Sequence, residues 1–267
     1  MGSLDGKTAL VFGVANNRSI AWGITEAFLR EGATVGLSYA GEVLEKRVFP
    51  LAEKAGIDFV DKCDVTSDEQ IEATFARAKG KFGKIDILVH AVAYASGDDL
   101  GGRFRDVSRS GFKMALDISA YSLIPMARHA AEIMPDGGSI MALTYYAAEK
   151  VMPRYNVMAI AKAALENIVR YLAADLGPEG IRVNALSPGP IRTLAAAGVP
   201  GFKMMYKYSE KVSPMRSQIT TEDVGGVAAF LASDAARQIN GETIYIDGGY
   251  HTLGLTTTLD DLADAEE

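Results

Sequence analysis

The sequence contains a single cysteine, Cys63, and three histidines, His90, His129 and His251, which are far apart in the chain. One cysteine excludes an internal disulfide framework and fits a reducing compartment. With so few thiol and imidazole groups, we expect no metal site. No apolar run approaches the ~20 residues that a membrane-spanning helix needs, and the first residues show no signal peptide. These absences predict a cytoplasmic protein with no membrane partner.

Positive charge is also scarce. The formal net charge is −7, and five of the acidic residues lie within residues 260–267. Without those five, the remaining chain carries a net charge of −2, so we expect no nucleic-acid partner. We predict that residues 1–254 form one domain and that residues 255–267 form an acidic, mobile tail.

Short apolar runs alternate with longer helical patterns along the chain. Several of the runs are apolar throughout, which is typical of strands whose two faces are both covered. The alternation predicts an α/β fold with a single-domain, Rossmann-like, doubly wound parallel sheet of about seven strands and helices on both faces. Strands are predicted at residues 8–12, 34–38, 58–62, 85–90, 139–144, 182–186 and 242–247, and helices at residues 20–31, 68–82, 119–134, 154–176 and 221–233.

Residues 187–214 interrupt this alternation. They contain four prolines, several glycines and no convincing strand. A loop of that length inside a compact α/β unit is usually functional, for example as a lid over an active site.

Tyr155 and Lys162 stand seven residues apart in the predicted helix at 154–176, and Tyr145 lies ten residues upstream of Tyr155. Seven residues cover nearly two helical turns, so the two side chains would share one face about 10 Å apart along the axis. A phenol and an ammonium in that arrangement can serve as a proton donor and as an anchor for a sugar or phosphate. Taken singly, each residue could equally be a packing or surface residue.

Small residues follow the first predicted strand, at Gly13, Ala15, Ser19 and Ala21. A dinucleotide-binding fold needs such a turn, because the backbone must approach the pyrophosphate at a helix N-terminus. Ser19 would cap the helix that begins at Ile20. The spacing is not the ordinary G-x-G-x-x-G, so an ordinary strand-to-helix turn remains an alternative.

Six features occur in order: residues 13–22, 63–65 and 88–91, the triple of Tyr145, Tyr155 and Lys162, and residues 187–193 and 247–250. Together they resemble the short-chain dehydrogenase/reductase superfamily, and within it the bacterial enoyl-[acyl-carrier-protein] reductases. The match spans roughly residues 4–250. The resemblance implies reduction of trans-2-enoyl thioesters, carried on acyl carrier protein, by NADH in fatty-acid biosynthesis. It also implies a homotetramer.

The resemblance further implies roles for individual residues. Tyr155 would donate a hydrogen bond to the substrate oxygen, Lys162 would bind the nicotinamide ribose, and Tyr145 would be a second catalytic hydroxyl. Substrate contacts would come from Ala95, Tyr155, Phe202 and Met205, under a lid at about residues 191–216. Cofactor contacts would come from Gly13, Ala15, Ser19, Ile20, Asp64, Val65, Val92, Lys162, Ile191, Thr193, Leu194 and Ala195.

Other functions remain open from the sequence. Carbonyl reductases of the superfamily usually have a lysine four residues after the tyrosine and a serine about 13 residues before it. This chain has Ala159 and Ala142 at those positions, which disfavours the second candidate, a 3-oxoacyl-thioester reductase. A third candidate is a non-catalytic dinucleotide-binding sensor. Residues 38–42 contain no base for a 2′-phosphate, so NADH is favoured over NADPH.

Some residues have simpler alternative roles. Asp64 could be a helix cap or a turn residue, and the methionines near residue 205 could be ordinary core. Between Arg192 and Arg216 the chain has five basic residues and one acidic residue. Acyl carrier proteins are strongly acidic, so this segment is a candidate docking patch, although a solvated helix face would show the same composition.

Overall fold

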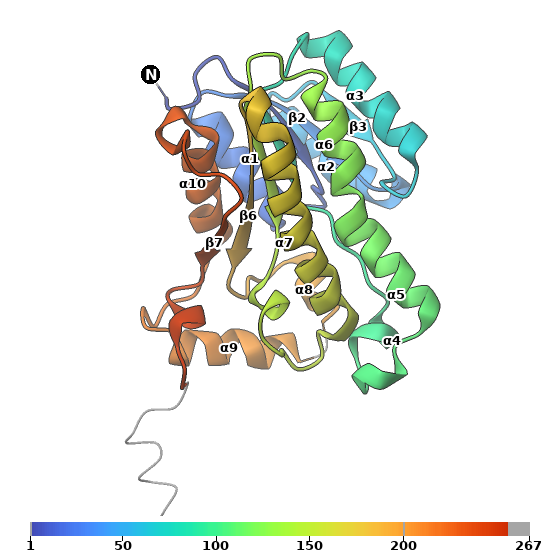
Figure 1. Ribbon diagram of the computed structural model, residues 1–267, viewed down its shortest axis with the longest axis vertical. Helices are drawn as coiled ribbons and strands as arrows, with labels where there is room; N and C mark the ends of the chain where they lie inside the picture. The colour runs from blue at the N-terminus through green and yellow to red at the C-terminus, as the bar shows by residue number, and fades with distance from the viewer. Residues whose placement is uncertain (1, 200, 256–267) are drawn as a thin grey trace, which may run out of the picture.

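Figure 1 shows the computed structural model of the protein, which describes residues 2–199 and 201–255. Seven strands form one parallel sheet in the order β3-β2-β1-β4-β5-β6-β7, as expected for a doubly wound fold. The chain crosses from one half of the sheet to the other between β3 and β4. The strands are β1 (Thr8–Phe12), β2 (Thr34–Tyr39), β3 (Val60–Lys62), β4 (Ile87–His90), β5 (Gly138–Leu143), β6 (Ile181–Pro188) and β7 (Thr243–Ile246).

Helices cover both faces of the sheet and enclose two separate cores. Successive side chains of β4 alternate between them: Ile87 and Val89 enter one core and Leu88 enters the other. Burial on both faces explains why the strands are apolar throughout. The first core lies under α1 (Ile20–Arg30), α2 (Glu42–Ala55) and α10 (Thr221–Ala232), and the second under α3 (Asp68–Phe82), α6 (Leu123–Ala131) and α7 (Asn156–Leu176).

Shorter helices gather where the strands end. In Figure 1, α4, α8 and α9 lie at the lower end of the molecule, toward which the strands point. Among the described residues, no helix is both long and apolar enough to cross a membrane. The remaining helices are α4 (Gly97–Leu100), α5 (Arg109–Leu116), α8 (Leu194–Ala197) and α9 (Phe202–Val212), with 3-10 turns at Phe104–Asp106, Tyr146–Ala148, Gly177–Glu179, Asp234–Ala236 and Tyr250–Thr252.

The prediction of one helix at 119–134 is wrong in part. A π-helical turn at Asp117–Tyr121 joins α5 to α6, and only the second part of the predicted segment is regular α-helix. A π turn adds a residue to the turn and shifts the buried face, which a pattern with a period of 3.6 does not register. The segment 187–214 contains the helices α8 and α9, which were not predicted. The predicted acidic tail, beyond Leu255, lies outside the described residues.

Helices α1 and α10 cross at two glycines. A Cβ atom on Gly225 would lie 2.6 Å from the carbonyl oxygen of Gly23, and one on Gly23 would lie 2.5 Å from the Cβ of Thr221. The two backbones therefore approach too closely for any side chain at these positions. This contact fixes α1 against the rest of the fold, and the first turn of α1 faces the end of the sheet at which the strands terminate.

We predict that Gly225→Ala destabilises the fold by about 1–3 kcal/mol, because the added methyl group overpacks this crossing. Gly226→Ala is the matched control, since a Cβ at Gly226 would have no heavy atom of the described residues within 4 Å. The control should be neutral or stabilise the helix by about 0.4–1 kcal/mol. Urea unfolding of both variants measures the difference, and equal effects would contradict the close crossing.

Candidate active site

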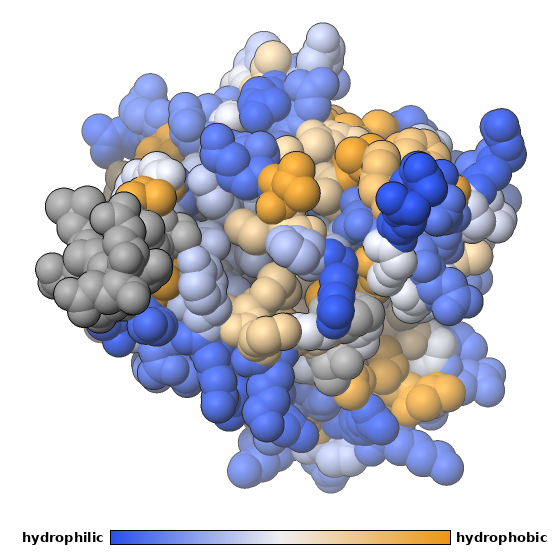
Figure 2. Space-filling view, turned by 90° about the horizontal axis from the view of Figure 1, so that it is seen from below, coloured by the Kyte–Doolittle hydropathy of each residue, from blue (hydrophilic) through white to orange (hydrophobic). Residues whose placement is uncertain are grey.

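The carboxyl ends of the parallel strands bring most of the predicted site residues to one edge of the sheet. Figure 2 shows this edge, with weakly polar and hydrophobic side chains in the middle and hydrophilic side chains around them. Phe202 and Met205 come to the same edge on α9. The residues that follow strand ends are Gly13, Ala15, Ser19 and Ile20 after β1, Asp64 and Val65 after β3, Val92 and Ala95 after β4, Tyr145 after β5, and Ile191, Thr193, Leu194 and Ala195 after β6.

The turn after β1 fits the phosphates of a dinucleotide. Gly13 has φ 97°, and a Cβ there would lie 2.2 Å from the carbonyl oxygen of Ala91, so only glycine fits. Ser19 is the N-cap residue of α1, as predicted, but its hydroxyl does not cap the helix. It donates instead to the carbonyl oxygen of Asn16 at 2.7 Å. The first amides of α1 are therefore left open for an anion.

Asp64 is a turn residue. Its carboxylate accepts hydrogen bonds from the Thr66 amide at 3.0 Å and the Thr66 hydroxyl at 2.8 Å. The cap of α3 is Ser67, whose hydroxyl accepts from the Gln70 amide, so the alternative that Asp64 caps this helix is wrong. Asp64 itself is exposed, whereas Val65 beside it is buried. The pair thus presents one polar and one apolar side chain beyond β3.

Two carboxylates lie close to the end of β2. Glu42 and Glu45 lie in the first turn of α2, directly after the strand. Lys46 and Arg47 are exposed on the same helix. A carboxylate close to the end of β2 suits a free ribose hydroxyl and repels a 2′-phosphate.

Tyr155 is held by a strained turn and not by a helix. It is the residue before α7, and its neighbours Arg154 and Asn156 have φ values of 62° and 25°, in the left-handed region. Each such residue costs on the order of 1–3 kcal/mol and persists only when its surroundings hold it. Asn156 Nδ2 donates to the carbonyl oxygen of Gly101 at 2.7 Å. The Arg154 guanidinium lies against Gly201, at the start of α9.

Tyr145 and Tyr155 form an aromatic pair, with ring centroids 5.0 Å apart and an interplanar angle of 66°. Burial raises the pKa of both phenols, so both are neutral hydrogen-bond donors at physiological pH. Ala95 and Tyr155 pack against the same small apolar cluster, which includes Leu100 and Met158. Tyr155 thus packs against an apolar cluster, and the Tyr145 ring contacts it.

Lys162 is buried, and its Nζ donates to the carbonyl oxygen of Leu143 at 2.6 Å. Burial lowers the pKa of Lys162 to about 8, and the nearby Glu166 carboxylate opposes this shift. Helix α7 begins at Asn156, two residues later than predicted, so Lys162 lies within it and Tyr155 is its N-cap residue. That both side chains share one face stays a prediction. The bond to Leu143 places the cation two residues from Tyr145.

The predicted lid contains a compact group of polar and aromatic contacts around Tyr206. The Arg192 guanidinium lies 4.3 Å from the centroid of the Tyr206 ring, and the Phe202 ring lies 5.9 Å from it. The Tyr206 hydroxyl donates to Gln218, whose amide donates to Glu210 at 2.6 Å. These contacts tie α9 to the residues that precede α10. Elsewhere in the lid, the Thr193 hydroxyl caps α8, and Leu194 and Ala195 are exposed.

Three residues at this edge were missed as site residues. The signal for Asn156 was its residue type, because asparagine tolerates left-handed φ values and here stands next to a candidate site tyrosine. Glu166 follows Lys162 by four residues, a spacing at which helical side chains meet, and it accepts a 2.7 Å hydrogen bond from Thr144. His90 was considered only as a possible metal ligand, and nothing in the sequence shows that it is buried.

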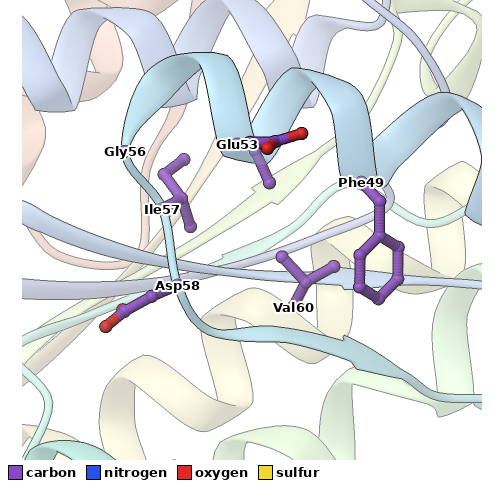
Figure 3. A pocket seen from close by; sticks show the side chains of 7 residues that line it. Phe49, Glu53, Gly56, Ile57, Asp58 and Val60 are labelled. Atoms are coloured by element: carbon purple, nitrogen blue, oxygen red, sulfur yellow. The ribbon is translucent and has the colours of Figure 1, made fainter.

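Figure 3 shows a hollow of about 510 Å³ that lies outside this site. It is lined by residues from the end of α2 and the start of β3, including Phe49, Glu53, Ile57 and Val60. Because β3 begins at Val60, the hollow is at the amino end of the strands, opposite to the tyrosines.

Comparisons with known proteins agree with the fold. A family model described as enoyl-(acyl carrier protein) reductase matches residues 13–251. An "Enoyl-[acyl-carrier-protein] reductase [NADH] 1" of Rhizobium meliloti is 50% identical over 95% of this chain and 93% of its own length. A FabI enzyme of Aquifex aeolicus, also named as NADH-dependent, is 50% identical over 96% of this chain and 95% of its own length.

A solved structure is equally similar. The Bacillus cereus enoyl-acyl carrier protein reductase, in complex with NADP+ and indole naphthyridinone, superposes with a TM-score of 0.94 at 50% identity. The superposition covers 96% of this chain and all of that one. Family model, relatives and structure agree over nearly the whole length, and the chain belongs to the enoyl-(acyl carrier protein) reductase family.

Proposed function

We propose that the protein reduces trans-2-enoyl thioesters on acyl carrier protein to acyl thioesters with NADH, as a step of fatty-acid biosynthesis. The observation that carries this proposal is the neutral pair of Tyr145 and Tyr155 beside the buried cation of Lys162. The names of the relatives, which are NADH-dependent enoyl-[acyl-carrier-protein] reductases, support the same reaction.

The chain's own groups fit NADH. Bound NADH would supply the hydride for the reduction. The open amides at the start of α1 suit its pyrophosphate, and Lys162 has further N–H donors for the ribose hydroxyls. Glu42 and Glu45 disfavour a 2′-phosphate. A related reductase of Anaplasma phagocytophilum, 44% identical, has been solved in complex with NAD. Residues 1–254 would therefore form the NAD-binding reductase domain.

Tyr155 would stabilise the charge that the reaction creates. Addition of hydride to the β carbon of an enoyl thioester places negative charge on the thioester oxygen. A neutral phenol beside an apolar wall can donate a hydrogen bond to that oxygen, and one such donor is typically worth about 2.7–4 kcal/mol. The Lys162 cation would favour the same anion. Ala142, which is fully buried in β5, has no hydroxyl to assist a carbonyl reduction.

The segment 191–216 would act as a lid over the acyl chain, with Phe202 and Met205 as its apolar contacts. On α9, the exposed residues Lys203, Lys207 and Lys211 recur every four residues and so lie along one side of the helix. The carboxylate of Glu210 accepts a hydrogen bond from Gln218. We propose that the three lysines dock the acidic carrier protein.

We further propose that the protein is a cytoplasmic homotetramer. Large apolar side chains are exposed on and beside α5 and α7 in the single chain, where a second copy could cover them. They are Phe112, Met114, Tyr121, Ile160 and Tyr171.

The direct test follows NADH oxidation with a trans-2-enoyl thioester and, in parallel, with a 3-oxoacyl thioester of the same length. We expect kcat/KM to be higher for the enoyl substrate by about 10²-fold or more. The tyrosine hydroxyl can donate to the thioester oxygen, whereas position 142 lacks the serine that carbonyl reductases usually have. Preference for the 3-oxoacyl thioester would establish the carbonyl reductase instead. Tight NADH binding with neither reaction would indicate the sensor.

Reversing the charge of Lys203 and Lys207 to Glu should raise KM for a carrier-linked enoyl substrate by about tenfold at low ionic strength and leave a CoA-linked substrate unchanged. Lys54→Glu with Lys79→Glu is the matched control, because these lysines lie near the ends of α2 and α3, at the opposite edge of the sheet. Equal effects on both substrates, or an equal effect of the control pair, would contradict docking at α9.

A further inference from the structure

His90 is a buried histidine with one unused ring nitrogen. It is the last residue of β4 and is fully buried. Its Nε2 lies 2.8 Å from the Ser122 hydroxyl, whereas its Nδ1 is buried and has no hydrogen-bond partner among the residues that the structure describes. A buried polar atom without a partner is rare in folded proteins, because it loses its hydrogen bonds to water on folding.

The hydrogen bonds around Ser122 assign the tautomer of His90. The Ser122 hydroxyl donates to the carbonyl oxygen of Ile118 at 2.7 Å, so its single proton is already used. Its oxygen must therefore accept from His90, which places the proton on Nε2. Burial, with a contribution from the Lys162 cation, lowers the pKa of His90 to about 3, so the ring stays neutral. Nδ1 is consequently an acceptor with a free lone pair.

Sheet register places this acceptor on the side of the sheet that carries Lys162. His90 pairs with Ala142 across β4 and β5, and the next residue of β5, Leu143, holds the Lys162 ammonium at 2.6 Å. Alternation along β4 puts His90 on the same face as Leu88, which packs in the core under α6 and α7. Lys162 is buried on α7 above that face and has two further N–H donors.

We propose that His90 is a positioning residue for Lys162: one buried water accepts a hydrogen bond from the Lys162 ammonium and donates one to His90 Nδ1. This inference rests on the proposed function, in which Lys162 binds the cofactor ribose. The Leu143 carbonyl would fix one N–H of the ammonium and the water a second, so that the third points toward the ribose. The neutral ring adds an acceptor without adding a charge, and it would keep the lysine protonated in a buried site.

Two other groups of the protein interact with the Lys162 ammonium. Glu166 acts on it from the same helix, and the Leu143 carbonyl contacts it from β5. Burial raises the pKa of Glu166. Glu149, beyond β5, also raises it, whereas Arg170, on α7, lowers it. None of these groups contacts His90 Nδ1, so a change at His90 should leave them in place.

Two substitutions of His90 separate the ring nitrogens. Asn places an oxygen acceptor at the position of Nδ1 and gives up the bond to Ser122, whereas Gln can keep a donor at the position of Nε2 and loses the Nδ1 acceptor. We expect His90→Gln to weaken NADH binding by about tenfold or more, the effect of losing a hydrogen bond to a charged group. His90→Asn should bind within about threefold of the wild type.

The pH dependence of NADH binding gives a readout that a purely structural role would not change. Wild-type binding should weaken as pH rises through about 8, because Lys162 loses its proton there. Without the acceptor the ammonium is less favoured, so in His90→Gln this loss should move about one pH unit lower. Equal behaviour of the Asn and Gln variants, in affinity and in pH dependence, would overturn the proposal. Failure of the wild type to bind NADH would instead overturn the proposed function.

Nitrogen-15 spectra of the wild type provide a measurement that does not depend on how well the variants fold. The chain has only three histidines. The signals that disappear in a His90 variant can therefore be assigned to His90. We expect a protonated Nε2 and a hydrogen-bonded, unprotonated Nδ1. A protonated Nδ1 would overturn the proposal.

Discussion

The hydrogen bond from the Lys162 ammonium to the Leu143 carbonyl determines how the parts of this site are placed. At 2.6 Å it joins α7 to the carboxyl end of β5, the point where the chain turns toward Tyr145. Without the bond, the buried cation would lose a hydrogen bond that offsets its loss of water. The bond therefore fixes Lys162, and with it the first two turns of α7, against the edge at which the strands end. Tyr145 and Tyr155 meet across that junction.

The second constraint is the strained turn that carries Tyr155. Arg154 and Asn156 have left-handed φ values that would relax in a free peptide, so the contacts of their side chains must offset the cost. Asn156 is held by the loop after α4, and Arg154 lies against Gly201 in the lid. Two segments that are distant in sequence thus orient one hydroxyl. In the proposed reaction a rigid hydroxyl would be useful, because catalysis depends on a donor that is already in position.

Much of the fold could be predicted, because strands buried on both faces and helices ended by glycine leave clear patterns. The location of the candidate site could also be predicted from the parallel sheet, because parallel strands bring their carboxyl ends to one edge. The π-helical turn at Asp117–Tyr121 and the strained turn at Tyr155 could not be predicted, because both depend on contacts from other parts of the chain. His90 illustrates the same limit: its hydrogen bond to Ser122 and its proposed link to Lys162 depend on segments that only the folded chain brings near.

In the proposed reaction, the Tyr155 hydroxyl stabilises charge during the chemical step and has little part in holding the cofactor. Tyr155→Phe tests this role most directly, with rapid-mixing measurements of enoyl thioester reduction and of NADH affinity. Tyr171→Phe serves as the control, because it removes a hydroxyl from α7 more than four turns beyond Tyr155 and keeps the aromatic ring. We predict that kcat falls about 10²–10³-fold while the Kd for NADH changes by less than about twofold. An unchanged kcat, or a loss that lies entirely in NADH affinity, would contradict the account.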